Sequence, residues 1–149
     1  PYTQPMTLVT GVIDALRELN AKKIVVGTPY LDEINTAEAE FLVKKGFEVL
    51  DIQGLNLETG IEFGQVTPQY WKCFALEIDC ADADAIFLSC GGIRSAEVAQ
   101  EIEAVVGKPV ITSNQAQMWS CLRRAGITDT IEGFGQIFSM PGATLLPSP

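Results

Sequence analysis

Short apolar runs alternate along the chain with stretches whose apolar residues recur at helical spacing. The runs predict four strands, at 22–27, 47–53, 85–89 and 109–112. The helical spacing predicts helices over 7–19, from about 32 to 46, from 67 onward, over 95–106 and over 114–125. The glycine-containing segment 54–66 is predicted to be a loop.

Residues typical of helix ends support these boundaries. Gly46 follows the second predicted helix, as a glycine after the last helical turn commonly does. Thr67 and Pro68 are suited to the N-cap and first helical positions of the next one. Ser113 or Asn114 is predicted to cap the last helix.

Strands that alternate with helices, and that read as continuous apolar runs, are typical of a parallel sheet covered on both faces. We therefore predict an α/β fold, a three-layer αβα sandwich with a four-stranded parallel sheet. With 149 residues, 47% of them hydrophobic, the chain can build one core. Residues 1–139 are predicted to form a single lobe and 140–149 a loose C-terminal tail.

The formal net charge of −9 disfavours nucleic acid and anionic membranes as partners. No apolar run is long enough to span a membrane, and no charged-then-apolar leader opens the chain, so a cytoplasmic protein is predicted. The chain begins at Pro1, and a free N-terminal proline can act as a base, as in the tautomerases. The irregular entry "PYTQP" favours an inert proline instead.

The sequence contains no histidine. This excludes a Ser-His-Asp triad, a Cys-His pair and any metal site with a histidine ligand. The cysteines lack the CxxC spacing of zinc and redox sites, and Cys73, Cys80 and Cys121 are predicted to be buried structural thiols. Because no glycine pattern matches the GxGxxG fingerprint, a nucleotide cofactor is disfavoured, and we predict no cofactor and no metal.

Unusual residues follow three of the predicted strands. "TPY" at 28–30 follows the first, "CGG" at 90–92 follows the third, and "SNQ" at 113–115 follows the fourth. Ligands of open α/β sheets bind beyond the carboxyl ends of the strands. These residues are therefore predicted to face one side of the sheet.

Cys90 is the candidate reactive group at this edge. A helix N-terminus predicted next to it would stabilise negative charge and lower the thiol pKa from ~8.5. The N–H groups of Gly91 and Gly92 suit a carboxylate or enolate oxygen, to which Tyr30 could donate its phenol hydrogen bond. The structural alternatives are a buried cysteine at a strand end, glycines required by the turn, and a tyrosine packed on its loop.

Five segments together resemble the aspartate/glutamate racemase superfamily, in its branch of maleate cis-trans isomerase and arylmalonate decarboxylase. They are "GTPYLDEIN", "GLNLETGIEFGQVTP", "LSCGGIRS", "GKPVITSNQAQMWSCLRRAGI" and "GFGQIF", in order along most of the chain. The resemblance implies a cofactor-free, metal-free enzyme that acts next to a carboxylate, in a site between two similar lobes. The expected substrate is a small dicarboxylate or a 2-substituted carboxylic acid.

The resemblance also implies roles for individual residues. Cys90 matches the cysteine of the second lobe, which is an acid/base thiol in racemases, the proton donor in the decarboxylase and one of a cysteine pair in the isomerase. Tyr30 matches the tyrosine that binds substrate carboxylate, and the backbone N–H groups after the cysteine fall on Cys90 and Gly91. Thr28 and Gly92 complete the predicted substrate-binding set.

No segment of the sequence corresponds to the first lobe of this family. We therefore expect a fragment, a homo-oligomer or a complementing N-terminal lobe. "SCGG" favours the decarboxylase and "SNQAQMW" favours the isomerase. A non-catalytic lobe that binds a small acid or another protein is the alternative, and a phosphate-binding flavodoxin-like domain is more distant.

Overall fold

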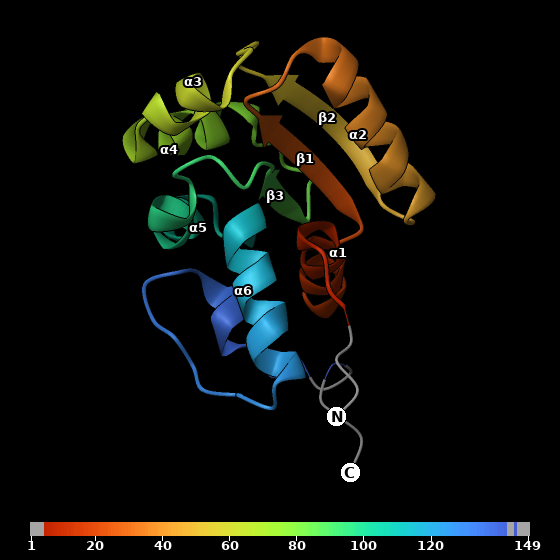
Figure 1. Cartoon of the computed structure of the whole chain (residues 1–149), viewed down its shortest axis with the longest axis vertical. Coiled ribbons are helices and arrows are strands. Elements are labelled where there is room, and N and C mark those ends of the chain that lie inside the picture. The colour runs from red at the N-terminus through yellow and green to blue at the C-terminus, as the bar shows by residue number, and fades with distance from the viewer. Residues whose placement is uncertain (1–4, 143–144, 146–149) are drawn as a thin grey trace.

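A four-stranded parallel sheet forms the centre of the protein. The computed structural model describes residues 5–142 and residue 145. The strands are β1 (Lys23–Thr28), β2 (Glu48–Gly54), β3 (Ala85–Leu88) and β4 (Val110–Thr112). They lie in the order β2-β1-β3-β4, and each neighbouring pair is parallel. Figure 1 shows β1 between β2 and β3. The predicted fold class is confirmed, and each strand boundary lies within one residue of its predicted position.

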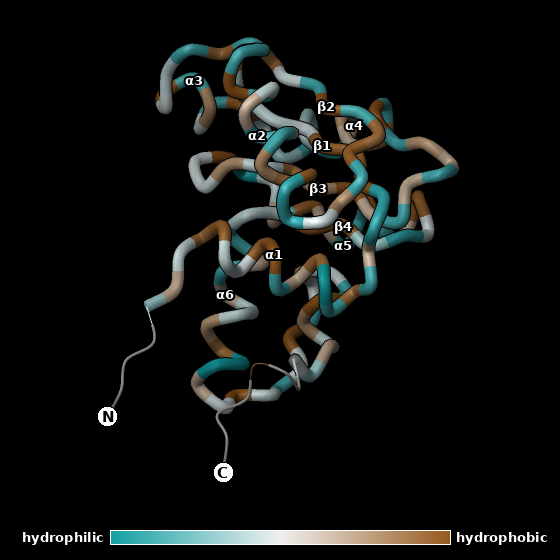
Figure 2. The backbone as a smooth tube through the Cα atoms, turned by 90° about the vertical axis from the view of Figure 1, so that its right-hand side faces the viewer, coloured by the Kyte–Doolittle hydropathy of each residue, from teal (hydrophilic) through white to brown (hydrophobic). Residues whose placement is uncertain are grey.

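Helices cover both faces of this sheet. On one face the core contains residues of α1 (Leu8–Glu18), α2 (Asp32–Lys44) and α6 (Ser113–Arg124). On the other face it contains residues of α4 (Pro68–Ile78) and α5 (Ala99–Val106). In the side view of Figure 2, hydrophobic stretches gather around β1 and β3, between these layers.

Successive side chains of β1 contribute alternately to the two cores, one on each face of the sheet. Ile24 and Val26 are fully buried on the face of α1, α2 and α6, whereas Val25 is fully buried on the face of α4 and α5. Successive side chains of a strand point to opposite faces, so a continuous apolar run serves both layers. At Gly27 a Cβ would lie 2.9 Å from the Leu88 side chain, so the close packing on the second face requires a glycine.

Two of the predicted helix-end signals act as expected. The Thr67 side chain caps α4 by accepting the Tyr70 N–H at 3.2 Å, and Pro68 is the first residue of that helix. Gly46, after α2, has a φ of +97°, a conformation that favours glycine. Local rules suffice at these positions because the interacting groups lie within one turn.

The predicted cap of the last helix is wrong. Neither Ser113 nor Asn114 caps α6; Thr112 does, by accepting the Gln115 N–H at 3.3 Å, and the Gln115 side chain bonds back to the Thr112 N–H at 2.9 Å. This reciprocal capping box leaves the side chains of Ser113 and Asn114 available for other contacts.

The segment 54–66, predicted to be a loop, contains a helix, α3 (Gly60–Gln65). Thr59 caps it, and Glu62 bonds back to the Thr59 N–H at 2.8 Å. A Thr followed three residues later by Glu is the sequence signal of this capping box. This signal is present in "TGIE", although the glycines of the segment favour a loop.

The helix predicted over 95–106 begins later than expected. A turn of 3₁₀-helix, η1 (Ala96–Val98), precedes α5, so no α-helix starts directly after Cys90. The helix N-terminus that lies beside this cysteine belongs to α6. The Ser113 Oγ accepts the Cys90 N–H at 3.1 Å, which joins the ends of β3 and β4.

The first part of the segment 140–149 is held against the helices. The Met140 carbonyl accepts the indole N–H of Trp119 at 3.1 Å, and the Gly142 N–H donates to Glu18 at 3.0 Å. Most of the remaining predicted tail lies outside the described residues, so its looseness stays a prediction.

Candidate active site

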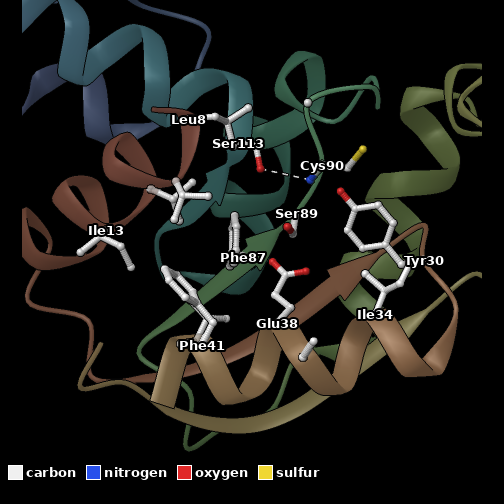
Figure 3. A pocket seen from close by; sticks show the side chains of 15 residues that line it. Leu8, Ile13, Tyr30, Ile34, Glu38, Phe41, Phe87, Ser89, Cys90 and Ser113 are labelled. Atoms are coloured by element: carbon white, nitrogen blue, oxygen red, sulfur yellow. Dashed lines mark hydrogen bonds between the residues drawn. The ribbon is translucent and has the colours of Figure 1, made fainter. Parts of the chain in front are cut away.

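The three strand ends meet beside a cavity of about 500 Å³ between α1, α2 and the end of β3 (Figure 3). Much of its wall is apolar and includes Val12, Phe41 and Phe87. Tyr30 and Cys90 also line it. The prediction that the residues after β1, β3 and β4 lie on one side of the sheet is therefore confirmed, since Ser113 contacts Cys90 directly.

Cys90 is held in an unusual backbone conformation. Its φ is 149°, in a region that residues with a side chain rarely adopt, and the residue is only 8% exposed. The Gly92 N–H donates to its Sγ at 3.2 Å. A backbone donor at this distance stabilises the negatively charged form of an acceptor, so a thiolate has a hydrogen-bond partner here.

The three backbone N–H groups near the cysteine have different partners. Those of Cys90 and Gly92 are engaged, by Ser113 and by the Cys90 sulfur. Within the described part of the chain, the Gly91 N–H has no acceptor, while the Gly91 carbonyl is fixed by the Asn114 amide at 3.1 Å. Among these groups, Gly91 therefore offers the free donor, and Gly92 serves the thiol.

Tyr30 directs its phenol toward the cysteine. The pKa of Tyr30 is raised far above its usual range, mainly because burial disfavours the charged phenolate. The hydrogen bond to the Cys90 sulfur and the nearby charges of Cys90 and Glu38 raise the pKa further. The phenol is therefore protonated at neutral pH and acts as a donor. The ring of Phe63, on α3, packs edge-on against Tyr30 with 5.7 Å between centroids, which orients the phenol.

Thr28 supports Tyr30 and does not line the cavity. It is fully buried, donates its hydroxyl to Asn35 at 2.5 Å and accepts the Tyr30 N–H at 3.1 Å. A Cβ at Gly54 would overlap the Tyr30 carbonyl and the Asn35 amide, so only glycine fits beside this turn. Thr28 thus positions Tyr30, and sequence analysis missed the contributions of Asn35 and Gly54.

Glu38 is a further residue that sequence analysis missed. It lies on α2, lines the cavity and points toward Ser89, the residue before Cys90 (Figure 3). Burial raises the pKa of the Glu38 carboxyl, and a hydrogen bond with Ser89 partly offsets this. The available signal was its spacing, since Glu38 falls four residues after Ile34 and three before Phe41 on an apolar stripe.

The other candidates of the sequence do not join this site. Cys73 and Cys121 are exposed and Cys80 is half-buried, so the prediction of buried structural thiols is wrong for them. Pro1 lies outside the described residues. In the part of the chain that the structure describes, no group of three or more acidic, cysteine or histidine side chains could hold a metal ion.

A family model described as arylmalonate decarboxylase matches residues 3–138. The chain belongs to this family. An arylmalonate decarboxylase from Bordetella bronchiseptica is 29% identical over 89% of this chain and 56% of its own length. A maleate isomerase from Geobacillus stearothermophilus is 26% identical over 87% of this chain and 52% of its own length. The predicted family relationship is thus confirmed.

Solved structures agree with this assignment. The maleate isomerase Iso(C200A) from Pseudomonas putida S16 with maleate has a TM-score of 0.87 and 25% identity, over 91% of this chain and 54% of that one. A crystal structure of arylmalonate decarboxylase has a TM-score of 0.81 and 27% identity, over 89% of this chain and 59% of that one. The chain spans about half the length of the curated relatives it matches. No helix among the described residues is long and apolar enough to cross a membrane.

Proposed function

We propose that this chain is the cysteine-bearing part of a cofactor-independent enzyme that acts on the carbon next to a carboxylate. One observation carries the proposal. A buried thiol, a protonated phenol and a free backbone N–H come together at the cavity, from Cys90, Tyr30 and Gly91. Membership of the arylmalonate decarboxylase family supports it.

Each group has a role in this chemistry. Tyr30 and the Gly91 N–H donate hydrogen bonds to the substrate carboxylate, and these strengthen as the carboxylate gains enediolate character. Cys90 transfers its thiol proton to the reacting carbon, as a general acid. The negative charge left on the sulfur is stabilised by the Gly92 N–H at 3.2 Å, because the single phenol proton of Tyr30 is engaged by the substrate carboxylate.

The apolar cavity wall favours decarboxylation of a malonate that carries an apolar substituent. In that reaction the bond to the departing carboxylate breaks, its electron pair forms the enediolate, and Cys90 supplies the proton. Val12, Phe41 and Phe87 would bury the substituent. Maleate isomerisation is the second candidate, because a maleate-bound relative shares both the fold and 25% of aligned residues. There the Cys90 sulfur would add to the double bond and leave after rotation.

The remaining catalytic contribution is proposed to come from outside this chain segment. The relatives are about twice as long as the matched region. A complementing lobe or a second copy of this chain would cover the open side of the cavity. The protein is proposed to act in the cytoplasm on a small carboxylic acid.

Alkylation with two related reagents tests the carboxylate site. Iodoacetate carries a carboxylate and iodoacetamide does not, and with either one a thiolate displaces iodide to form a thioether. Cys73 and Cys121 are internal controls, because both are exposed in the same protein. Peptide mass spectrometry measures the ratio of the iodoacetate rate to the iodoacetamide rate at each cysteine.

We expect this ratio to be at least about tenfold higher at Cys90 than at the controls, which corresponds to about 1.4 kcal/mol. Tyr30→Phe should lower the ratio at Cys90 and leave the controls unchanged. An equal ratio at Cys90 and the controls would refute a carboxylate site next to this thiol. Proton NMR with phenylmalonate and with maleate, in wild type and Cys90→Ala, then distinguishes decarboxylation from isomerisation.

A further inference from the structure

One charged residue lies on the otherwise apolar face that α2 presents to the cavity. The α2 residues that line it are Ile34, Ala37, Glu38, Phe41 and Leu42. Their spacing of three and four residues is that of a single helix face. The reaction proposed above uses neither Glu38 nor its charge.

No ion pair among the described residues includes this carboxyl. Ser89 is its hydrogen-bond partner, and no lysine or arginine lines the cavity within the described residues. Glu38 is half-buried, and a partly desolvated carboxylate without a compensating charge is unfavourable, so this desolvation raises the pKa of Glu38. A ligand that brought a positive charge would remove this cost and would keep Glu38 ionised.

We propose that Glu38 makes the cavity a subsite for an ammonium group at the far end of an alkyl chain on the substrate. The apolar walls contact the methylene groups, and the Glu38 carboxylate accepts hydrogen bonds from the ammonium. Ser89 orients one side of the carboxylate and leaves further lone pairs for the ligand. Binding of the carboxylate end of this substrate rests on the proposed function, in which the Tyr30 phenol and the Gly91 N–H are the hydrogen-bond donors.

The inference narrows the substrate class. Within the proposed class of malonates with an apolar substituent, a substituent that lacks an ammonium group leaves the Glu38 charge unpaired. A second carboxylate placed beside Glu38 is repelled, so the subsite favours decarboxylation over maleate isomerisation. A zwitterion with its two charges at opposite ends of an alkyl chain satisfies both ends of the site. Glu38 is thus a specificity-determining residue, distinct from the groups that act on the reacting carbon.

Matched ligands test this subsite. The probes are the straight-chain ω-amino acids with four, five and six carbons, each compared with the unsubstituted alkanoate of the same length. Calorimetry or ligand-observed NMR gives the dissociation constants for the wild type, for Glu38→Gln, which keeps the size of the side chain, and for Glu38→Leu, which continues the apolar stripe. Circular dichroism verifies that each variant is folded.

We expect at least one ω-amino acid to bind the wild type at least about tenfold more tightly than its alkanoate. The preference should disappear in Glu38→Gln and reverse in Glu38→Leu. The proposal is overturned if the alkanoates bind the wild type equally well or better, if neither series binds, or if the preference survives in Glu38→Gln.

A separate measurement distinguishes this failure from failure of the proposed function. Straight-chain alkylamines of the same lengths carry the ammonium without a carboxylate. Glu38-dependent binding of these amines, combined with equal alkylation ratios at all cysteines, would retain the subsite and reject the carboxylate site at Cys90. Selective alkylation of Cys90 by iodoacetate without Glu38-dependent amine binding would retain the proposed function and reject the subsite.

Discussion

The backbone conformation of Cys90 leads to a prediction in which glycine is more stabilising than alanine. A φ of 149° lies in a region that is nearly restricted to glycine, and a side chain held there stores strain of about 1–3 kcal/mol. Cys90→Ala keeps the Cβ and therefore the strain. Cys90→Gly removes both, while the two variants lose the same buried sulfur.

The sign of the stability difference between Cys90→Gly and Cys90→Ala shows whether the backbone at Cys90 is strained. At an unstrained position, replacing alanine by glycine costs about 0.5–1 kcal/mol in backbone entropy. At Cys90, relief of strain outweighs this cost, and Cys90→Gly should be more stable than Cys90→Ala by about 0.5–2 kcal/mol. For a domain of this size, that difference corresponds to a few degrees in Tm.

Urea unfolding of the two variants, followed by circular dichroism, measures the difference from the midpoints and slopes. Ala81→Gly serves as the control, because Ala81 lies on an exposed turn and its φ is not positive. The control should lose stability while the glycine at position 90 gains it relative to alanine. If Cys90→Gly is less stable than Cys90→Ala by the same amount as the control, the cysteine carries no backbone strain.

Three further measurements test other parts of the structure. Arg123 is fully buried and donates hydrogen bonds to the backbone carbonyls of Met140, Ile127, Asp129 and Phe138. Arg123→Met leaves these acceptors unpaired and should lower the free energy of unfolding in urea by about 3–5 kcal/mol. A loss below about 1 kcal/mol would contradict this reasoning. Burial raises the pKa of Glu38 in the folded state. The protonated carboxyl therefore contributes stability that is fully present below the unfolded-state pKa of about 4.3 and is lost as pH rises through the folded-state pKa. Glu38→Gln should therefore gain stability relative to wild type between pH 4 and neutrality, and a pH-independent difference would refute the raised pKa. Light scattering should give a mass of at least two chains, and the mass of one chain would contradict self-association through the open cavity.

Local sequence patterns were sufficient for the layers of the fold. Each apolar run became a strand because a strand buried on both faces needs apolar residues at every position, as β1 shows with Ile24, Val25 and Val26. Thr67 and Pro68 marked the start of α4 because a cap acts within a single turn. The carboxyl ends of parallel strands share one edge, so the position of Cys90 near Tyr30 also followed from the pattern.

The partners within the site depended on tertiary structure. Ser113 takes the Cys90 N–H from 23 positions away, which leaves Gly91 rather than Cys90 as the free donor. Glu38 contacts Ser89 because α2 and the end of β3 line the same cavity, and no local rule relates residues on separate elements. The sequence by itself determined which segments form strands and which thiol lies at the edge of the sheet. The packing of helices across the sheet decided which polar groups are paired and which remain for a ligand, because these contacts depend on distances between segments that are remote in the chain.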